Sequence, residues 1–196
     1  MRSPETHAGY MPGPLPSQWR HRYGMSRTVW LTGLSGSGKS TLALAVSESL
    51  HMQGLACVVL DGDVLRRSLC RNLGFSAADR SENVRRVAQV ASLFNQAGAM
   101  AIVAMISPLT ADRDTARSIL GAHRMLEVYL STPLEVCERR DPKGLYQRAR
   151  AGEIADFTGI SAPYQAPPHA QLVLNTGELA LPDCTSLVLQ ALNAPS

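Results

Sequence analysis

One stretch of the chain has the residue types and spacing of a phosphate-binding loop (P-loop): Gly33-Leu34-Ser35-Gly36-Ser37-Gly38-Lys39-Ser40-Thr41. The glycines let consecutive backbone N–H groups turn toward a polyphosphate, and a helix that begins there directs its positive dipole end at the same anion. In this motif Lys39 reaches the β- and γ-phosphates and the Ser40 hydroxyl binds Mg²⁺. Thr41 supplies the next hydroxyl, a candidate contact for the α-phosphate. The pattern indicates a site for a nucleoside triphosphate and Mg²⁺.

The flanking residues provide the elements that this loop requires. Residues 28–31 are β-branched or apolar and predict a strand, whereas residues 41–50 predict a helix. Strand, loop and helix therefore follow in the order of a P-loop. This context argues against the alternative, a glycine-rich turn that binds nothing.

Polar residues follow two further predicted strands. The apolar run at 55–60 ends in Asp61-Gly62-Asp63, and the run at 99–106 ends in Ser107-Pro108. Carboxyl ends of strands face the crevice where α/β proteins bind ligands. We expect Asp63 to orient an acceptor hydroxyl and Asp61 to hold Lys39 or a Mg²⁺-bound water. Alternatively, such an aspartate only caps the following helix.

The remaining pattern alternates helices and strands. Helices are predicted from an Asp79-x-x-Glu82 capping box onward and at 111–121, 134–140 and 185–193, and strands at 126–130 and 172–174. Without internal repeats, this order predicts an α/β fold of the P-loop NTPase type, a doubly wound parallel sheet flanked by helices. Residues 141–168 break the pattern with Gly and Pro and carry basic side chains, so they predict an irregular, basic lid segment.

Composition limits the class of protein. With 196 residues, of which 45% are hydrophobic, the chain suits one α/β domain at 25–196 behind a Pro- and Gly-rich tail at 1–24. It has no apolar run long enough for a membrane span and no signal peptide, so we expect a cytoplasmic protein without a membrane partner. The four cysteines have no metal-ligand spacing, which favours free thiols and no structural zinc. A formal charge of +3 does not indicate nucleic-acid binding.

Among NTP-binding proteins, small-molecule kinases fit best. The chain has no Asn-Lys-x-Asp motif of a GTPase and no apolar strand ending in Asp-Glu, which a motor or transport ATPase usually carries. A small-molecule kinase needs an acceptor pocket, an orienting carboxylate, cations for the transferred phosphoryl group and a lid that excludes water. The features above supply each of these.

Between residues 28 and 176 the chain resembles the adenylyl-sulfate kinase family in a series of segments in family order. These are the P-loop with Trp30-Leu31-Thr32, Asp61-Gly62-Asp63 with Arg66, Gly74-Phe75-Ser76 with Asp79-Arg80 and Glu82-Asn83, Ile106-Ser107-Pro108 with Arg113, and Asp141-Pro142-Lys143-Gly144-Leu145-Tyr146 with Phe157-Thr158-Gly159-Ile160. The resemblance implies transfer of the ATP γ-phosphoryl group to the 3′-hydroxyl of adenosine 5′-phosphosulfate (APS). The products are ADP and 3′-phosphoadenosine 5′-phosphosulfate.

The resemblance also implies roles for individual residues. Lys39, Asp63 and Ser107 are the expected catalytic residues, and Ser40 is the expected ligand of Mg²⁺. We interpret Ser107 mainly as a contact to the acceptor, because in-line transfer needs no covalent intermediate. Expected ATP contacts are Gly33, Leu34, Ser35, Gly36, Ser37, Gly38, Lys39, Ser40, Thr41 and, against the base, Arg139. Expected APS contacts are Asp61, Asp63, Arg66, Phe75, Arg80, Asn83, Ile106, Ser107, Lys143, Leu145 and Phe157, with the adenine between the two phenylalanines.

Some alternatives stay open at this point. Arg66 and Arg80 suit an oxyanion but are also ordinary surface residues, and Phe157 is also a candidate core residue. Val64 and Gln147-Arg148 depart from the family, where Asn and two lysines are common. The family implies a homodimer and a functional association with ATP sulfurylase. The other candidates are a kinase for a nucleoside or sugar acid, and an inactive nucleotide-binding subunit, against which the acceptor-side residues argue.

Overall fold

Five parallel strands form the centre of the protein in a computed structural model that describes residues 27–194. The strands are β1 (Thr28–Thr32), β2 (Cys57–Asp61), β3 (Met100–Ala104), β4 (Met125–Leu130) and β5 (Leu172–Leu174), in the spatial order β2-β3-β1-β4-β5. The central strand β1 pairs with β3 on one side and β4 on the other. The predicted tail at 1–24 lies outside the described residues.

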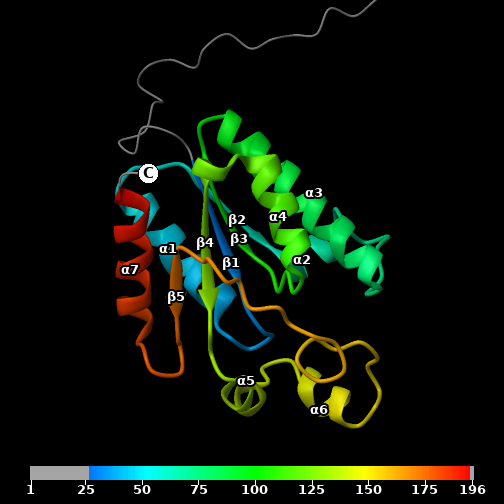
Figure 1. Ribbon diagram of the computed structural model, residues 1–196. Helices are drawn as coiled ribbons and strands as arrows, with labels where there is room; N and C mark the ends of the chain where they lie inside the picture. Colours follow the sequence, from blue (N-terminus) through cyan, green and yellow to red (C-terminus); the bar gives the residue numbers. More distant parts are fainter. Residues whose placement is uncertain (1–26, 195–196) are drawn as a thin grey trace, which may run out of the picture.

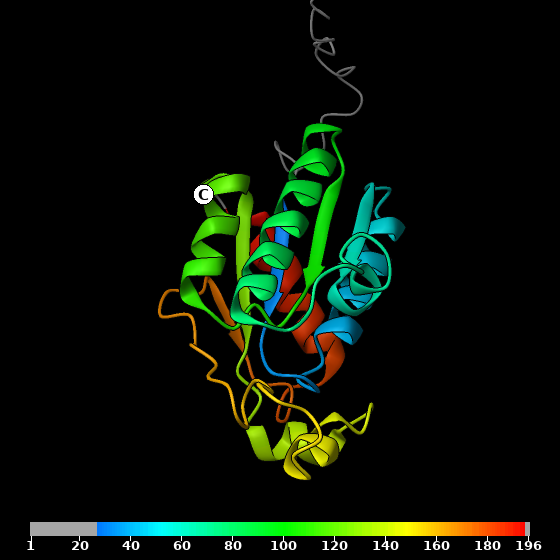
Figure 2. The ribbon, with the colours of Figure 1, turned by 90° about the vertical axis from the view of Figure 1, so that its right-hand side faces the viewer.

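Helices cover both faces of the sheet. One face packs against α1 (Lys39–Met52) and α7 (Leu181–Asn193), and the other against α3 (Ala77–Gln96) and α4 (Thr110–Leu120) (Figure 1). After a turn of 90° about the vertical axis, α3 and α4 lie in front of the sheet (Figure 2). The predicted doubly wound α/β fold is therefore confirmed.

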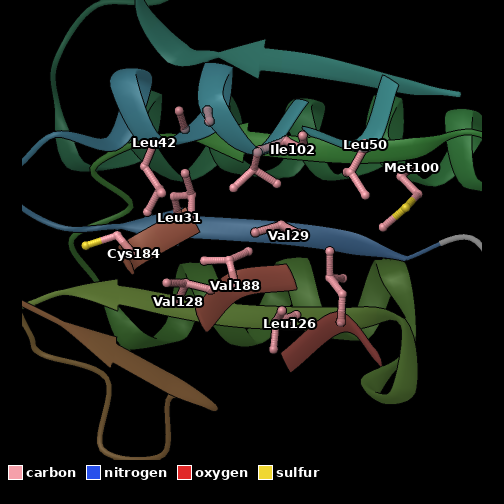
Figure 3. Close-up of a cluster of buried hydrophobic side chains, with 14 of the residues drawn as sticks. Val29, Leu31, Leu42, Leu50, Met100, Ile102, Leu126, Val128, Cys184 and Val188 are labelled. Carbon is pink, nitrogen blue, oxygen red and sulfur yellow. The ribbon is translucent and has the colours of Figure 1, made fainter. Parts of the chain in front are cut away.

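Alternating residues of β1 determine which helices pack on each face. Val29 and Leu31 point into the cluster formed with α1 and α7, where Leu42 and Val188 meet them (Figure 3). Trp30 points the opposite way, into the cluster with α3 and α4. All three β1 side chains are fully buried, which explains why this strand is a continuous apolar run.

The shorter elements gather beyond the carboxyl ends of the strands. There, α2 (Gly62–Arg66) follows β2, and α5 (Leu134–Arg140) and α6 (Leu145–Arg150) follow β4 (Figure 1). A 3₁₀ turn, η2 (Ala122–Arg124), precedes β4 at the opposite edge. The chain order of the strands reverses at β1, because β3 lies on one side of β1 and β4 on the other. Ligands of open α/β sheets bind at the carboxyl end of such a switch point, so this end of β1 is the expected ligand-binding position.

Three local predictions were wrong. The chain begins helix α3 at Ala77 with Ser76 as its cap, so the capping pair is Ser76 and Asp79 rather than Asp79 and Glu82. Residues 141–168 are not wholly irregular, since they contain α6. The closing helix begins at Leu181 rather than at residue 185, because a proline in its first turn is compatible with a helix start. Within residues 27–194, no helix has the length and apolar character to cross a membrane.

Candidate active site

The P-loop connects β1 to α1 at the carboxyl edge of the sheet. Gly33, Gly36 and Gly38 adopt positive φ angles of 149°, 73° and 92°. A Cβ atom on Gly36 would lie 2.9 Å from the carbonyl oxygen of Cys137, so α5 packs directly against the loop. Glycine is therefore required at this position both by the backbone angle and by the close approach of α5.

The Lys39 side chain lies along the P-loop. Its Nζ donates hydrogen bonds to the carbonyl oxygens of Gly33 at 3.0 Å and Leu34 at 2.6 Å. Burial lowers the pKa of Lys39 to about 8, while nearby Asp63 acts in the opposite direction. An anion at the loop would favour the charged form, so lysine charge and anion binding are linked.

Ser40 and Asp61 bring two side-chain oxygen atoms together. The Ser40 hydroxyl donates to Asp61 Oδ2 at 2.5 Å, and Asp61 Oδ1 accepts from the backbone N–H groups of Asp63 and Val64. Asp61 thus caps α2 and also lies beside the hydroxyl of the P-loop. This oxygen pair fits Mg²⁺, which proteins commonly bind through one or two side chains plus substrate phosphates. Within residues 27–194 no group of three or more His, Cys, Asp and Glu side chains could hold a metal.

A cavity of about 960 Å³ extends from the P-loop to the loop that follows α2. Lys39 and Ser40 of the P-loop line this cavity, and so do Arg66 and Phe75. Asp63 is also part of the wall and forms an ion pair with Lys143. The candidate catalytic carboxylate therefore shares one cavity with the P-loop and with Arg66 and Phe75.

Phe75 is held in an exposed position by two arginines. Its side chain is 63% exposed, and the Arg66 guanidinium lies 4.5 Å from its ring centroid. Arg66 donates to Gly74 O and Arg80 donates to Phe75 O, each at 2.8 Å. Burial lowers the pKa of Arg66, and neighbouring Arg80 lowers it further. Two adjacent cations beside an exposed ring suit an anionic, aromatic ligand.

Phe157 serves as a core residue and also lines the cavity. It is 8% exposed and contacts the Tyr146 ring edge-on, with centroids 5.0 Å apart. Lys143, Leu145 and Phe157 all contribute to the wall of the same cavity. The two interpretations of Phe157 offered by the sequence are therefore compatible.

Ser107 is buried and bonded within the protein. Its hydroxyl accepts from Trp30 Nε1 at 3.1 Å and donates to Thr32 Oγ1 at 3.1 Å. Its φ angle of 38° is unusual for a residue other than glycine. Because the hydroxyl proton is already donated to Thr32, this geometry favours a structural contact over a covalent role.

Two more predicted residues lie at the cavity wall near Ser107. Ile106 lines the cavity, as does Asn83, which is 3% exposed. Asn83 Oδ1 has no hydrogen-bond partner among the described residues. A buried acceptor facing a cavity is a position where a ligand can supply the missing donor.

The sequence profile of the family described as "Adenylylsulphate kinase" matches residues 25–175. The chain belongs to the adenylylsulphate kinase family. An adenylyl-sulfate kinase of Shewanella amazonensis is 56% identical over 150 residues, which cover 76% of each chain. One of Bacteroides thetaiotaomicron is 52% identical over 83% of this chain and 81% of its own.

The fold agrees with a solved member of the adenylylsulphate kinase family. The APS kinase of Mycobacterium tuberculosis in complex with AMPPNP and APS has a TM-score of 0.84 and 46% sequence identity. The match covers 87% of this chain and 99% of that one. Of the positions where this chain departs from the family pattern, Val64 and Gln147 are not part of the cavity wall, whereas Arg148 is.

Sequence reasoning missed Arg140 at the end of α5 and its partner Thr176, which follows β5. Arg140 lines the cavity and donates to Thr176 Oγ1 at 2.8 Å, Thr176 O at 2.6 Å and Gly36 O at 3.3 Å. Arg139, the predicted contact of the base, is exposed and is not part of the cavity wall. Thr176 follows the carboxyl end of a predicted strand, which is the signal that could have identified it.

Proposed function

We propose that the chain transfers the γ-phosphoryl group of ATP to the 3′-hydroxyl of APS, as an adenylyl-sulfate kinase. The observation that carries this proposal is the cavity of about 960 Å³, whose wall contains Lys39, Asp63 and Phe75 together. Phosphoryl transfer between two small molecules needs both in one site, aligned and away from water. The related enzyme of Mycobacterium tuberculosis was solved with AMPPNP and APS together.

At the nucleotide end, the P-loop and the start of α1 bind the phosphates. Backbone N–H groups of the loop donate to the phosphate oxygens, and the N-terminus of α1 adds its dipole. Lys39 exchanges its two carbonyl partners for the β- and γ-phosphates. Ser40, with Asp61 beside it, is the proposed site for Mg²⁺, which when bound neutralises charge that develops on the phosphates.

At the acceptor end, Asp63 orients the 3′-hydroxyl and takes up its proton. The hydroxyl oxygen then bonds to the γ-phosphorus while the bond from that phosphorus to the ADP oxygen breaks. Lys143, which is paired with Asp63, can turn to the transferred group. The two aromatic residues at the cavity wall, Phe75 and Phe157, are the proposed contacts of the adenine ring.

Charge and chain placement support the remaining roles. Arg66 and Arg80 are the proposed contacts of the phosphosulfate, because two close guanidinium groups suit an oxyanion. Residues 141–168 supply Lys143, Leu145 and Phe157 to the cavity wall, which supports the proposal that this segment is a lid over bound substrates.

The experiment is a coupled assay of ADP release with Mg²⁺-ATP and APS. Adenosine 5′-monophosphate, a nucleoside and a sugar acid serve as alternative acceptors. We expect turnover with APS alone, and a loss of kcat of about 10²- to 10⁴-fold in Asp63→Asn, which keeps the shape of the side chain but removes its basicity.

The matched control is Asp114→Asn, which changes an exposed carboxylate of α4 outside the cavity wall. This variant retains wild-type turnover if the Asp63 effect is local. Turnover with a different acceptor would assign another kinase activity, and ATP binding without any turnover would favour a regulatory subunit.

Self-association and a functional link to ATP sulfurylase remain proposals. A hexameric APS kinase of Thiobacillus denitrificans is 32% identical, although the match covers only 29% of that chain. Light scattering of the purified protein distinguishes a dimer from a monomer. A pull-down with ATP sulfurylase tests the second association.

A further inference from the structure

Arg113 of α4 connects three parts of the chain from a buried position. Its side chain is 2% exposed, and it is not part of the cavity wall. One terminal nitrogen donates to Ser107 O at 2.8 Å, and the other donates to Gln165 O at 2.7 Å. One guanidinium thus contacts both the loop after β3 and the segment around Gln165. This segment follows residues 142–158, several of which line the cavity.

Glu127 of β4 forms a buried ion pair with this guanidinium. Its Oε1 lies 3.0 Å from Arg113 Nε, and its Oε2 accepts from Arg117 at 2.7 Å. Glu127 is only 5% exposed, so both members of the Arg113 pair are buried. A buried cation requires a paired anion, and here the anion comes from a central strand of the sheet.

A second set of bonds joins the same two segments. The Gln165 N–H group donates to Pro108 O at 2.8 Å, and Gln165 Oε1 accepts from the Thr110 N–H at 2.8 Å. Next to it, the Tyr164 hydroxyl lies 2.9 Å from Thr32 Oγ1. In Figure 1 the chain after α6 returns to β5 as an extended yellow to orange segment, and these bonds attach it to the sheet on the way.

The hydroxyl protons in this region have a consistent arrangement. Thr32 donates to Ile106 O at 2.7 Å, so it accepts from both Ser107 and Tyr164. The hydroxyl protons of Thr32, Ser107 and Tyr164 are therefore all donated to acceptors within the protein. Ser107 keeps its positive φ of 38° because its hydroxyl and its carbonyl group are both held.

We propose that Arg113 is a positioning residue for the APS end of the site, an inference that rests on the proposed function. It fixes the wall formed by Ile106 and Ser107 and joins that wall to the returning end of the 141–168 segment. Without these bonds, the Ser107 backbone relaxes from its strained angle and displaces the wall. A displacement of about 1 Å in a substrate-positioning group can reduce activity by about 10²-fold.

The test compares Arg113→Lys with Arg117→Lys. Both substitutions replace a guanidinium that pairs with Glu127, but only Arg113 contacts Ser107 and Gln165. A lysine keeps the positive charge and cannot reach both carbonyl groups and Glu127 at once. We expect Arg113→Lys to raise the KM for APS about 10- to 100-fold and to change the KM for ATP less than twofold, whereas Arg117→Lys leaves both KM values unchanged.

This difference between the two substrates separates positioning from stability. A variant that is merely unstable has fewer active molecules and a lower apparent kcat, with both KM values unaltered. If Arg113→Lys fails to fold, Glu127→Gln decides, because it keeps the shape of the side chain that faces Arg113 Nε and removes only its charge, so the guanidinium loses its buried anion while Arg113 itself is unchanged. We expect it to raise the KM for APS about threefold to tenfold.

Two results would overturn the inference. An unchanged KM for APS in folded Arg113→Lys refutes it, as does an unchanged value in Glu127→Gln when Arg113→Lys does not fold. In both cases wild-type turnover with APS leaves the proposed function intact. Absence of wild-type turnover with APS refutes the proposed function and the inference together.

Discussion

Raising the pH from 7 to 9 is expected to weaken nucleotide binding about tenfold, because Lys39 loses its charge in this interval. Burial lowers the pKa of this lysine to about 8 in the ligand-free protein. By linkage, about nine tenths of the lysines are charged at pH 7 and about one tenth at pH 9, given a pKa of about 8. Bound phosphates favour the charged form, so affinity is greatest below pH 8 and falls as the pH rises through it.

The assay is isothermal titration calorimetry with Mg²⁺-AMPPNP at several pH values. Bound Mg²⁺ keeps the phosphates deprotonated throughout, which removes their own titration from the result. Repeating the titration at pH 8.5 in buffers of different ionisation enthalpy measures proton uptake on binding. We expect an uptake of most of one proton per nucleotide, since about three quarters of the lysines are neutral at that pH when the pKa is about 8.

Lys39→Met is the control for this measurement. It removes the titrating group, so its weaker binding is expected to be independent of pH between 7 and 9. Equal affinities of the wild type at both pH values would show that Lys39 stays charged throughout. A pH dependence that persists in Lys39→Met would assign it to another group.

Two further predictions concern Gly36 and Phe75 of the cavity wall, with Gly54 as the control position for the first. Gly36→Ala and Gly54→Ala both place a side chain at a similar positive φ, 73° and 75°, but only at Gly36 does the new Cβ approach another atom, Cys137 O at 2.9 Å. In urea denaturation we expect Gly54→Ala to lower the free energy of unfolding by about 1 kcal/mol. Gly36→Ala is expected to lower this free energy further and to weaken AMPPNP binding. Equal losses of stability in the two variants, with normal AMPPNP binding in Gly36→Ala, would contradict the close approach. Phe75→Ala is expected to leave the melting temperature within about 2 °C, because the ring is 63% exposed, and to raise the KM for APS at least tenfold; a normal KM would remove Phe75 from the acceptor site.

Local patterns in the sequence were sufficient for the main architecture. The P-loop is one continuous segment whose function depends on its own backbone, so Gly33 to Lys39 could be identified before any contact was known. The apolar runs predicted all five strands: β1, β3 and β4 are largely buried and therefore hydrophobic, and the partly buried β2 and β5 are apolar runs as well. Asp61, the last residue of β2, and Asp63 just after it were placed correctly at the carboxyl edge, because they end one of these apolar runs.

Helix starts and the short helices were harder to predict. The choice between Asp79 and Ser76 as cap depends on which residue leaves the helical angles first, and several nearby residues can serve. Asp61 illustrates the same limit, since it both caps α2 and bonds to Ser40. The sequence presented capping as the alternative to holding Lys39 or a Mg²⁺-bound water, and Lys39 bonds to Gly33 O and Leu34 O instead. Helices of five or six residues such as α2 and α6 have too few turns for a periodic pattern.

Contacts between distant segments were decided by the tertiary structure alone. Arg140 lines the cavity and its neighbour Arg139 does not, because α5 is oriented so that Arg140 meets Thr176, which is 36 residues away in the sequence. Arg113 likewise meets Gln165 across 52 residues. A motif describes neighbours along the chain, and no local rule states which of 17 arginines will face a partner supplied by another strand or loop. Those partners are brought together only when the sheet and its helices have packed.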